Sequence, residues 1–363
     1  MHEVIRRNCE GLGASLHLMR CPTDDGGMIF AFRTGSYSPV WVARRGTGKR
    51  GWRRVQCERR ALEWILPWHA ALRAPALLDV LETPKEIWVV QAGLCGQPRF
   101  IRIGPSGQLP PEILMAAGWL HQLQDIVLTP VDADLTEVAR AWARDAAVRP
   151  DGWSEPLWQQ VQSACQMVPA VATHGDFWVG NLLFERSGMS VIDWNTFHAG
   201  NPLDDLLTLF LTLPRKQHRR YLDRMECFLA SFFTPGPALN LMQAWTRRRG
   251  IDARAARFCF YLHLARRIRW EFGFGLQSRS WKSIETSQRF WKRALQWLAE
   301  RDFPDPFSRP PRLEEGCLPW ERIIPIRASD RVPAAPSRSV SASSCAPHDR
   351  RADSESVAPG GRR

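Results

Sequence analysis

The stretch THGDFWVGNLLF at residues 173–184 decides the fold of this chain, together with VIDW at 191–194 and GNPLDDL at 200–206. The apolar runs that follow Asn181 and precede Asp193 have the length of short strands, and the Ser-Gly pair between them is typical of a turn. The sequence therefore predicts a β-hairpin within 170–194. Such a hairpin places Asn181 and Asp193 at the same end, twelve residues apart in sequence.

Oxygen-bearing side chains gather at that end of the predicted hairpin. An amide oxygen and a carboxylate suit a hard cation such as Mg²⁺, which prefers oxygen ligands and keeps several waters. Asp176 begins the preceding loop and can face a reacting hydroxyl beside such a cation. Phosphoryl transfer from a nucleotide requires these roles, because one carboxylate accepts the acceptor's proton while an amide and a second carboxylate hold the metal.

The spacing of His174, Asp176 and Asn181 matches the catalytic loop of protein kinases, and Asp193 matches their later metal-binding aspartate. The sequence resembles the aminoglycoside phosphotransferase and choline-kinase-like branch of the protein-kinase-like superfamily. Three motifs carry the resemblance: His174-Gly175-Asp176 with Asn181, Asp193-Trp194, and Gly200-Asn201-Pro202-Leu203-Asp204-Asp205-Leu206. The resemblance is strong over about 170–210 and weaker over about 28–125, and it does not extend beyond about 310.

The resemblance implies a fold and a role for each motif residue. The fold is α+β and two-lobed, with a small antiparallel sheet in an N-lobe (1–93) and a mainly helical C-lobe (94–326). Asp176 would be the catalytic base, and Asn181 and Asp193 would hold Mg²⁺. His174 would brace the loop. Asp205 would hydrogen-bond the loop backbone from a buried helix start, or would simply be a helix-start carboxylate favoured by the helix dipole.

In the N-lobe, β-rich runs at 28–35 and 39–45 predict a hairpin, followed by a Gly-rich basic loop at 46–52, a helix over 55–66 and a strand over 86–93. The family places a lysine in the second strand to bind the nucleotide phosphates, paired to a glutamate of the helix. Arg44 stands at that position, and Lys49 is the alternative. The paired glutamate is Glu58, with Glu63 as its alternative.

Two further N-lobe segments would contact the nucleotide by the same resemblance. Residues 33–38 would cover the phosphates. Residues 90–93, with Gln91 and Gly93, would form the hinge against the adenine or guanine ring, so that the bound nucleotide is ATP or GTP.

Apolar spacing predicts a helix over 111–124, and further helices near 135–147, 157–167, 203–213, 218–232, 253–272 and 284–301. From about residue 327 the composition shifts to Ser, Pro, Ala, Arg and Gly, which predicts a disordered tail.

The 363-residue chain is 44% hydrophobic and 24% charged, which is globular composition. Its formal charge of +12 comes with only five lysines, so coding bias toward arginine competes with an anionic partner as the explanation. Without a nucleic-acid-reading motif, no nucleic-acid partner is expected. Nine cysteines lack metal-ligand spacing, and we expect them reduced and mostly buried in a cytoplasmic protein. The most apolar run, 206–213, is too short to span a bilayer.

Basic runs at 215–220, 247–249 and 266–269 disfavour a polycationic acceptor, unless they face solvent elsewhere. They favour a neutral or anionic acceptor, such as the hydroxyl of a sugar-like compound or a metabolite. Tryptophans at 245, 270, 281, 291 and 297 could stack on a sugar, although 291 and 297 have the spacing of core residues. The alternative function is a catalytically degenerate kinase-like protein that binds a nucleotide or a partner without turnover.

Overall fold

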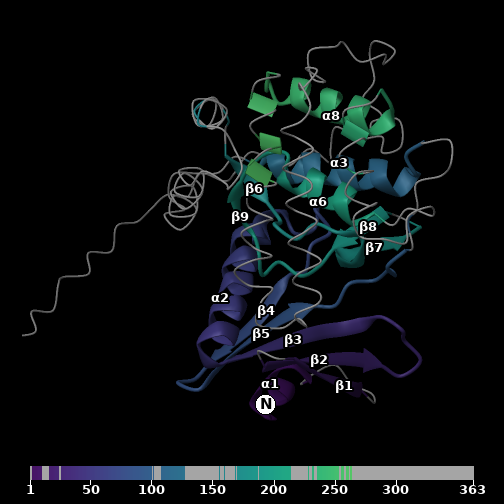
Figure 1. Ribbon diagram of the computed structural model, residues 1–363. Helices are drawn as coiled ribbons and strands as arrows, with labels where there is room; N and C mark the ends of the chain where they lie inside the picture. Colours follow the sequence, from purple (N-terminus) through teal and green to yellow (C-terminus); the bar gives the residue numbers. More distant parts are fainter. Residues whose placement is uncertain are drawn as a thin grey trace, which may run out of the picture. The chain divides into compact units, whose positions relative to one another are not determined.

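The computed structural model contains a five-stranded antiparallel sheet with the order β1-β2-β3-β5-β4 (Figure 1). Its strands are β1 (Leu16–Thr23), β2 (Gly26–Arg33), β3 (Pro39–Thr47), β4 (Leu77–Glu82) and β5 (Glu86–Ala92). Strands β2, β3 and β5 match the sequence predictions to within two residues. Strands β1 and β4, and the helix α1 (His2–Cys9), were not predicted.

Helices cover both faces of this sheet, because its central strands carry apolar residues on both sides. On one face Trp41, Ala43 and Trp88 pack with Val4 of α1. On the other face Ile87 and Val89 pack with residues of α2 (Gly48–Ile65), which is followed by a short 3-10 turn (Leu66–Trp68). Arg44 pairs with Val89 across β3 and β5, so it projects from the α2 side of the sheet.

The basic loop predicted at 46–52 is not a loop. Strand β3 runs to Thr47 and helix α2 begins at Gly48. The glycines permit a direct return of the chain, since a Cβ on Gly46 would lie 2.4 Å from the Gly51 carbonyl oxygen. The sequence prediction took this glycine-rich stretch as a loop, whereas the glycines allow the strand and the helix to approach closely.

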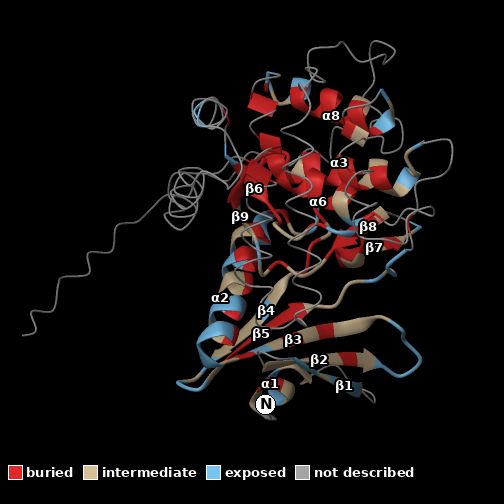
Figure 2. Ribbon diagram, viewed as in Figure 1, coloured by how far each residue is buried: buried red, intermediate tan, exposed pale blue. Residues whose placement is uncertain are grey.

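The remainder is mainly helical, which makes the fold α+β and two-lobed. Its elements are α3 (Pro111–Asp125), β6 (Val171–Thr173), a 3-10 turn (Val179–Asn181), β7 (Leu182–Glu185), β8 (Gly188–Val191), β9 (His198–Gly200), α6 (Asp204–Thr212) and α8 (Pro237–Arg248). Figure 2 shows buried residues concentrated in α3, α6 and α8. Strands β7 and β8 form the predicted hairpin, and Ile192 donates its amide to the Asn181 carbonyl 3.0 Å away.

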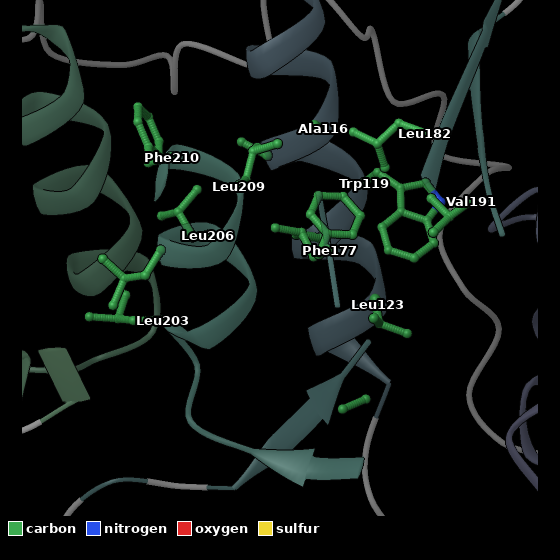
Figure 3. Packing of buried hydrophobic residues seen from close by; sticks show 14 of the residues in the cluster. Ala116, Trp119, Leu123, Phe177, Leu182, Val191, Leu203, Leu206, Leu209 and Phe210 are labelled. Carbon is green, nitrogen blue, oxygen red and sulfur yellow. The ribbon is translucent and has the colours of Figure 1, made fainter. Parts of the chain in front are cut away.

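Helix α3 forms the centre of the helical core. Trp119 stacks on Phe177, with ring centroids 5.4 Å apart (Figure 3). It also packs against Trp194, with ring centroids 5.9 Å apart. One side chain thus supports both the loop after Asp176 and the segment after Asp193. The Trp119 indole also donates to the Leu72 carbonyl, 2.5 Å away, and so connects α3 to the turn after α2.

The structure describes residues 2–9, 16–23, 26–99, 101, 108–126, 155, 159, 168, 170–186, 188–213, 228, 231–232, 235–252, 255–256, 259–260 and 262–263. These all belong to one unit of the chain, Met1–Val332. The predictions of helices at 135–147 and 284–301, and of a tail from 327, lie outside the described residues. So do most residues of the helices predicted at 157–167, 218–232 and 253–272.

Five cysteines of the described part form no disulfide: Cys9, Cys21, Cys57, Cys95 and Cys259. Only Cys259 of these is buried, so the expectation of mostly buried cysteines is wrong for this part of the chain. No helix in the described ranges is both long and apolar enough to cross a membrane.

Candidate active site

The loop 174–178 leaves β6 through a glycine that cannot be replaced without strain. Gly175 has φ +86°, and a Cβ there would lie 2.3 Å from the Thr196 carbonyl oxygen. Thr196 in turn donates its hydroxyl to the His174 carbonyl at 3.0 Å. The middle residue of the His-Gly-Asp motif therefore lets the loop lie directly against the segment that follows Asp193.

Asp205 supports this loop from the first turn of α6. Its Oδ2 accepts the His174 amide at 2.6 Å, and its Oδ1 accepts the Gly175 amide at 2.9 Å. Complete burial raises the pKa of Asp205 to about 7, although the two amide hydrogen bonds lower it. Asp205 thus makes the backbone contacts that the resemblance implies, while also standing at a helix start.

His174 is fully buried between aromatic rings. Its Nε2 donates to the Ile192 carbonyl at 3.0 Å, and its ring meets Phe177 and Trp194 edge-on. Burial lowers the pKa of His174 to about 4, so the ring is neutral at physiological pH. A neutral histidine bonded to the backbone beside Asp193 is suited to bracing the loop, and it lies too deep to meet a substrate.

Asn181 connects the loop to the hairpin. Its Nδ2 donates to the Asp176 carbonyl at 2.9 Å and approaches the Asp176 carboxylate at 3.4 Å. These bonds use the amide nitrogen, and no hydrogen bond of the described residues uses Asn181 Oδ1. The amide oxygen is therefore directed away from Asp176 and is available to a cation.

Asp193 has the left-handed φ of +68°, shared in the described part of the chain with only one other non-glycine residue, Arg73. Non-glycine residues in this conformation cost free energy and cluster at functional sites. The carboxylate accepts a hydrogen bond from the Asn195 amide on Oδ1, and it is partly exposed. Its backbone and side chain are thus both held in a defined position at the end of β8.

Arg44 crosses from the sheet to this carboxylate. Its Nη1 donates to Asp193 Oδ1 at 2.8 Å, while its Nε lies 3.1 Å from Glu58 Oε2. Lys49 is exposed in the first turn of α2, and Glu63 is exposed and pairs with Arg59. Of the alternatives left open by the sequence, the structure therefore brings together Arg44 and Glu58.

Glu58 is fully buried, the Arg44 side chain is 14% exposed, and each of the two shifts the pKa of the other. Burial raises the pKa of Glu58, and Arg44 and Arg54 oppose that rise. Burial would lower the pKa of Arg44, but Glu58 and Asp193 outweigh it and the pKa is raised. Glu58 receives no hydrogen bond from a described residue, so its contact with Arg44 is an ion pair without hydrogen-bond geometry.

Gln91 and Gly93 lie where β5 ends. Gln91 pairs with Val42 and shares the sheet face of Arg44; it is buried, and its Oε1 has no partner among the described residues. Gly93 donates to the Val40 carbonyl at 2.8 Å, and a Cβ there would collide with the Pro39 carbonyl. A buried amide oxygen without a partner can accept a hydrogen bond from a ligand.

Two oxygen atoms of the site fit part of the coordination shell of a hard divalent cation. Asn181 Oδ1 and Asp193 Oδ2 are oxygen ligands of the kind that Mg²⁺ prefers. Within the described ranges no cluster of three His, Cys, Asp or Glu side chains has the arrangement of a metal site. Water and nucleotide oxygens would therefore complete the shell. Asp193 Oδ1 is already engaged by Arg44 and Asn195.

Two contacts of the site were not predicted from sequence. Arg54 of α2 lies with its Nη2 3.9 Å from Asp193 Oδ2, and Asn195 bonds the same carboxylate. The Asn195 contact could have been found from its place two residues after Asp193. No local pattern distinguishes Arg54 from the other arginines of α2.

The predicted stacking role of Trp245 is wrong. Its ring is buried, and its indole donates to the Pro202 carbonyl at 3.1 Å, so it belongs to the core. In the basic run 247–249, Arg249 is bound to Asp125 and His121 of α3, whereas Arg247 and Arg248 are exposed. The other tryptophans and basic runs proposed for acceptor contacts lie outside the described residues.

Comparison with known proteins agrees with the motifs. Residues 105–238 match the model of the phosphotransferase enzyme family. The matched segment contains Asp176, Asn181, Asp193 and Asp205, and the match confirms the resemblance stated from the motifs. No curated protein matches the chain.

Solved structures resemble the chain at low sequence identity. A choline/ethanolamine kinase family protein from Mesorhizobium loti is 15% identical, with a TM-score of 0.46, over 85% of this chain and 98% of that one. The aminoglycoside phosphotransferase APH(3'')-Id from Streptomyces rimosus, in complex with ADP and streptomycin, is 17% identical, with a TM-score of 0.38. The match covers 72% of this chain and 96% of that one.

Proposed function

We propose that this protein is a Mg²⁺-dependent small-molecule kinase that transfers the γ-phosphate of ATP or GTP to a hydroxyl group. The observation that carries the proposal is the convergence of Asp176, Asn181 and Asp193 at one end of the β7–β8 hairpin, with Arg44 and Glu58 brought to Asp193 from the sheet. These side chains supply a base, oxygen ligands and a cation for phosphates, which phosphoryl transfer requires together.

In this proposal Asp176 accepts the proton of the acceptor hydroxyl. The hydroxyl oxygen bonds to the γ-phosphorus, the bond to the β,γ-bridging oxygen breaks, and the nucleoside diphosphate leaves. Asn181 holds Asp176 through its amide nitrogen and offers its oxygen to the metal with Asp193. Bound Mg²⁺ would neutralise the charge that develops on the phosphates. Arg44, oriented by Glu58, steadies the phosphates, and Gln91 and Gly93 border the base.

The acceptor that we propose is neutral or anionic, such as a sugar-like compound or a metabolite. The chain's charge of +12 disfavours a polycation, since like charges repel before contact. Trp178 is exposed two residues after Asp176, where an indole face can contact an acceptor ring. A cytoplasmic location, where nucleotide and Mg²⁺ are supplied, belongs to the same proposal.

The second candidate is a nucleotide-binding protein that lacks turnover. Arg44 favours it, because a planar guanidinium replaces the compact ammonium of lysine and already holds Asp193. The two candidates agree on nucleotide binding and differ on phosphate transfer.

Phosphate transfer distinguishes them. Purified full-length protein is incubated with Mg²⁺ and γ-labelled ATP or GTP, with a panel of neutral, anionic and polycationic hydroxyl compounds, and with water as the only acceptor. We expect label transfer by the wild type and a loss of at least about 100-fold in Asp176→Asn, which binds nucleotide normally. Equal transfer by wild type and Asp176→Asn contradicts the proposal, and nucleotide binding without transfer to any acceptor favours the second candidate.

A further inference from the structure

Two guanidinium groups meet the Asp193 carboxylate from different elements. Arg44 of β3 reaches Oδ1 at 2.8 Å, and Arg54 of α2 lies 3.9 Å from Oδ2. Arg54 stands one helical turn before Glu58, on the same side of α2. The position of the candidate metal ligand is therefore defined by cations on both of its oxygens.

The two arginines differ in exposure and in their distance from Asp193. The Arg44 side chain is only 14% exposed and has Glu58 as a second anionic partner. The Arg54 side chain is 45% exposed, and its Nη2 lies at the longer distance from the Asp193 carboxylate. A divalent cation held by Asp193 would compete with Arg54 for the same oxygen, since Oδ2 is the oxygen that Arg44 leaves available.

Displacement of Arg54 from Asp193 would place two like charges side by side, the guanidinium and the metal. Such an arrangement is stable only where further anionic oxygens lie between them. Phosphate oxygens meet this requirement, because a guanidinium binds phosphate through paired N–H groups while the metal binds other oxygens of the same group.

We propose that Arg54 is a phosphate-positioning residue, which exchanges the Asp193 carboxylate for the polyphosphate of the nucleotide when the divalent cation binds. This inference rests on the proposed function and deepens it. The exchange couples the two ligands: the cation releases Arg54 for the phosphates, and the phosphates hold Arg54 away from the cation's ligand. The affinity for nucleotide therefore depends on Mg²⁺ partly through Arg54.

Calorimetric titration of the full chain with ATP, ADP and AMP, in Mg²⁺ and in EDTA, tests the exchange. The variants are Arg54→Gln, the charge-preserving Arg54→Lys, and the control Arg53→Gln, which changes the exposed neighbour of Arg54. We expect Arg54→Gln to weaken ATP binding in Mg²⁺ about tenfold and to reduce the gain in affinity that Mg²⁺ brings. AMP binding should change less than about twofold, Arg54→Lys should recover part of the loss, and Arg53→Gln should bind as the wild type does.

Two results overturn the inference while leaving the proposed function intact. One is Arg54→Gln binding ATP in Mg²⁺ as tightly as Arg53→Gln does. The other is equal weakening of ATP and AMP, which indicates a general disturbance of the site. A wild type that binds neither ATP nor GTP in Mg²⁺ overturns the proposed function and the inference with it. Thermal unfolding of each variant without ligand shows whether a loss of affinity accompanies a loss of folding.

Discussion

Arg44 donates a 2.8 Å hydrogen bond to Asp193, a residue 149 positions further along the chain. The bond joins the sheet to the end of the β7–β8 hairpin, and the same guanidinium faces the buried Glu58. A single side chain thus connects the element expected to bind phosphates with the residue expected to bind the metal.

Replacement of Arg44 by methionine should destabilise the protein by about 3 to 5 kcal/mol, because it removes the cation that forms an ion pair with the buried Glu58 carboxylate. Urea unfolding of the full chain measures this change. Arg44→Lys should destabilise the protein less than Arg44→Met does, since lysine keeps one positive charge near Glu58. The double variant Arg44→Met/Glu58→Gln should recover part of the stability of Arg44→Met. A double variant that loses the sum of both single effects would show that the two residues do not interact.

Asp205→Asn should destabilise the protein by about 2 to 4 kcal/mol, because its amide nitrogen cannot accept one of the two hydrogen bonds from His174 and Gly175. The matched control is Glu63→Gln, an exposed change on α2 that should stay within about 0.5 kcal/mol of the wild type. Chemical denaturation compares them at pH 7.5. Equal stability of both variants would exclude Asp205 as a support of the loop.

His174 makes stability depend on pH in a direction fixed by its burial. Its pKa is about 4 in the folded protein, below that of an exposed histidine, so the unfolded chain binds more protons between pH 4 and 6.5. The contribution of His174 to the free energy of unfolding is complete above the histidine pKa of the unfolded chain, and it is lost as pH falls toward 4. It amounts to about 3 kcal/mol.

The pH dependence that Asp205 contributes to stability has the opposite sign, because its raised pKa makes the folded state bind more protons between about pH 4 and 7. The wild-type profile alone therefore mixes the two effects. The difference in unfolding free energy between wild type and His174→Gln, measured in EDTA from pH 4 to 8, isolates His174. It should change by about 3 kcal/mol across this range in favour of the wild type at high pH. Parallel profiles would show that His174 is not held neutral.

The motif residues could be placed from sequence because their spacing is local. The hairpin, its turn and the ends of β2, β3 and β5 follow from alternation and short-range turn signals. Strand β1 escaped prediction because it lies at the sheet edge with mostly exposed residues and contains Pro22. The start of α2 was mistaken because Gly46 and Gly51 serve close packing, which one sequence does not distinguish from a loop.

The contacts between distant segments were beyond prediction for a different reason. Arg54 reaches Asp193 only because α2 packs on β3, whose Arg44 bonds the same carboxylate. Helix α2 offers several arginines of equal local character. The choice of Arg44 over Lys49 likewise depends on strand register, which the continuation of β3 to Thr47 sets. Such choices require the assembled sheet.

Asn181→Leu should abolish the metal dependence of nucleotide binding while retaining much of the fold. The substitution keeps the size of the side chain but removes the amide oxygen, and it also breaks the hydrogen bond to the Asp176 carbonyl. Titration of Mg²⁺ into the nucleotide-saturated protein measures the effect, with Asn240→Leu on α8, outside the candidate site, as the matched control. Unchanged Mg²⁺ affinity in Asn181→Leu would remove Asn181 from the metal site.

The central claim is tested most directly by thermal unfolding of the wild type and of Asp193→Ala with ATP and with GTP, each in Mg²⁺ and in EDTA. A ligand that binds only the native state stabilises it by about 2.7 kcal/mol at a hundredfold excess over Kd. We predict that nucleotide raises the Tm of the wild type in Mg²⁺ and much less in EDTA, and that Asp193→Ala shows no Mg²⁺-dependent rise relative to its own ligand-free Tm. The same Mg²⁺-dependent rise in both proteins, or no rise in the wild type with either nucleotide, would contradict the account.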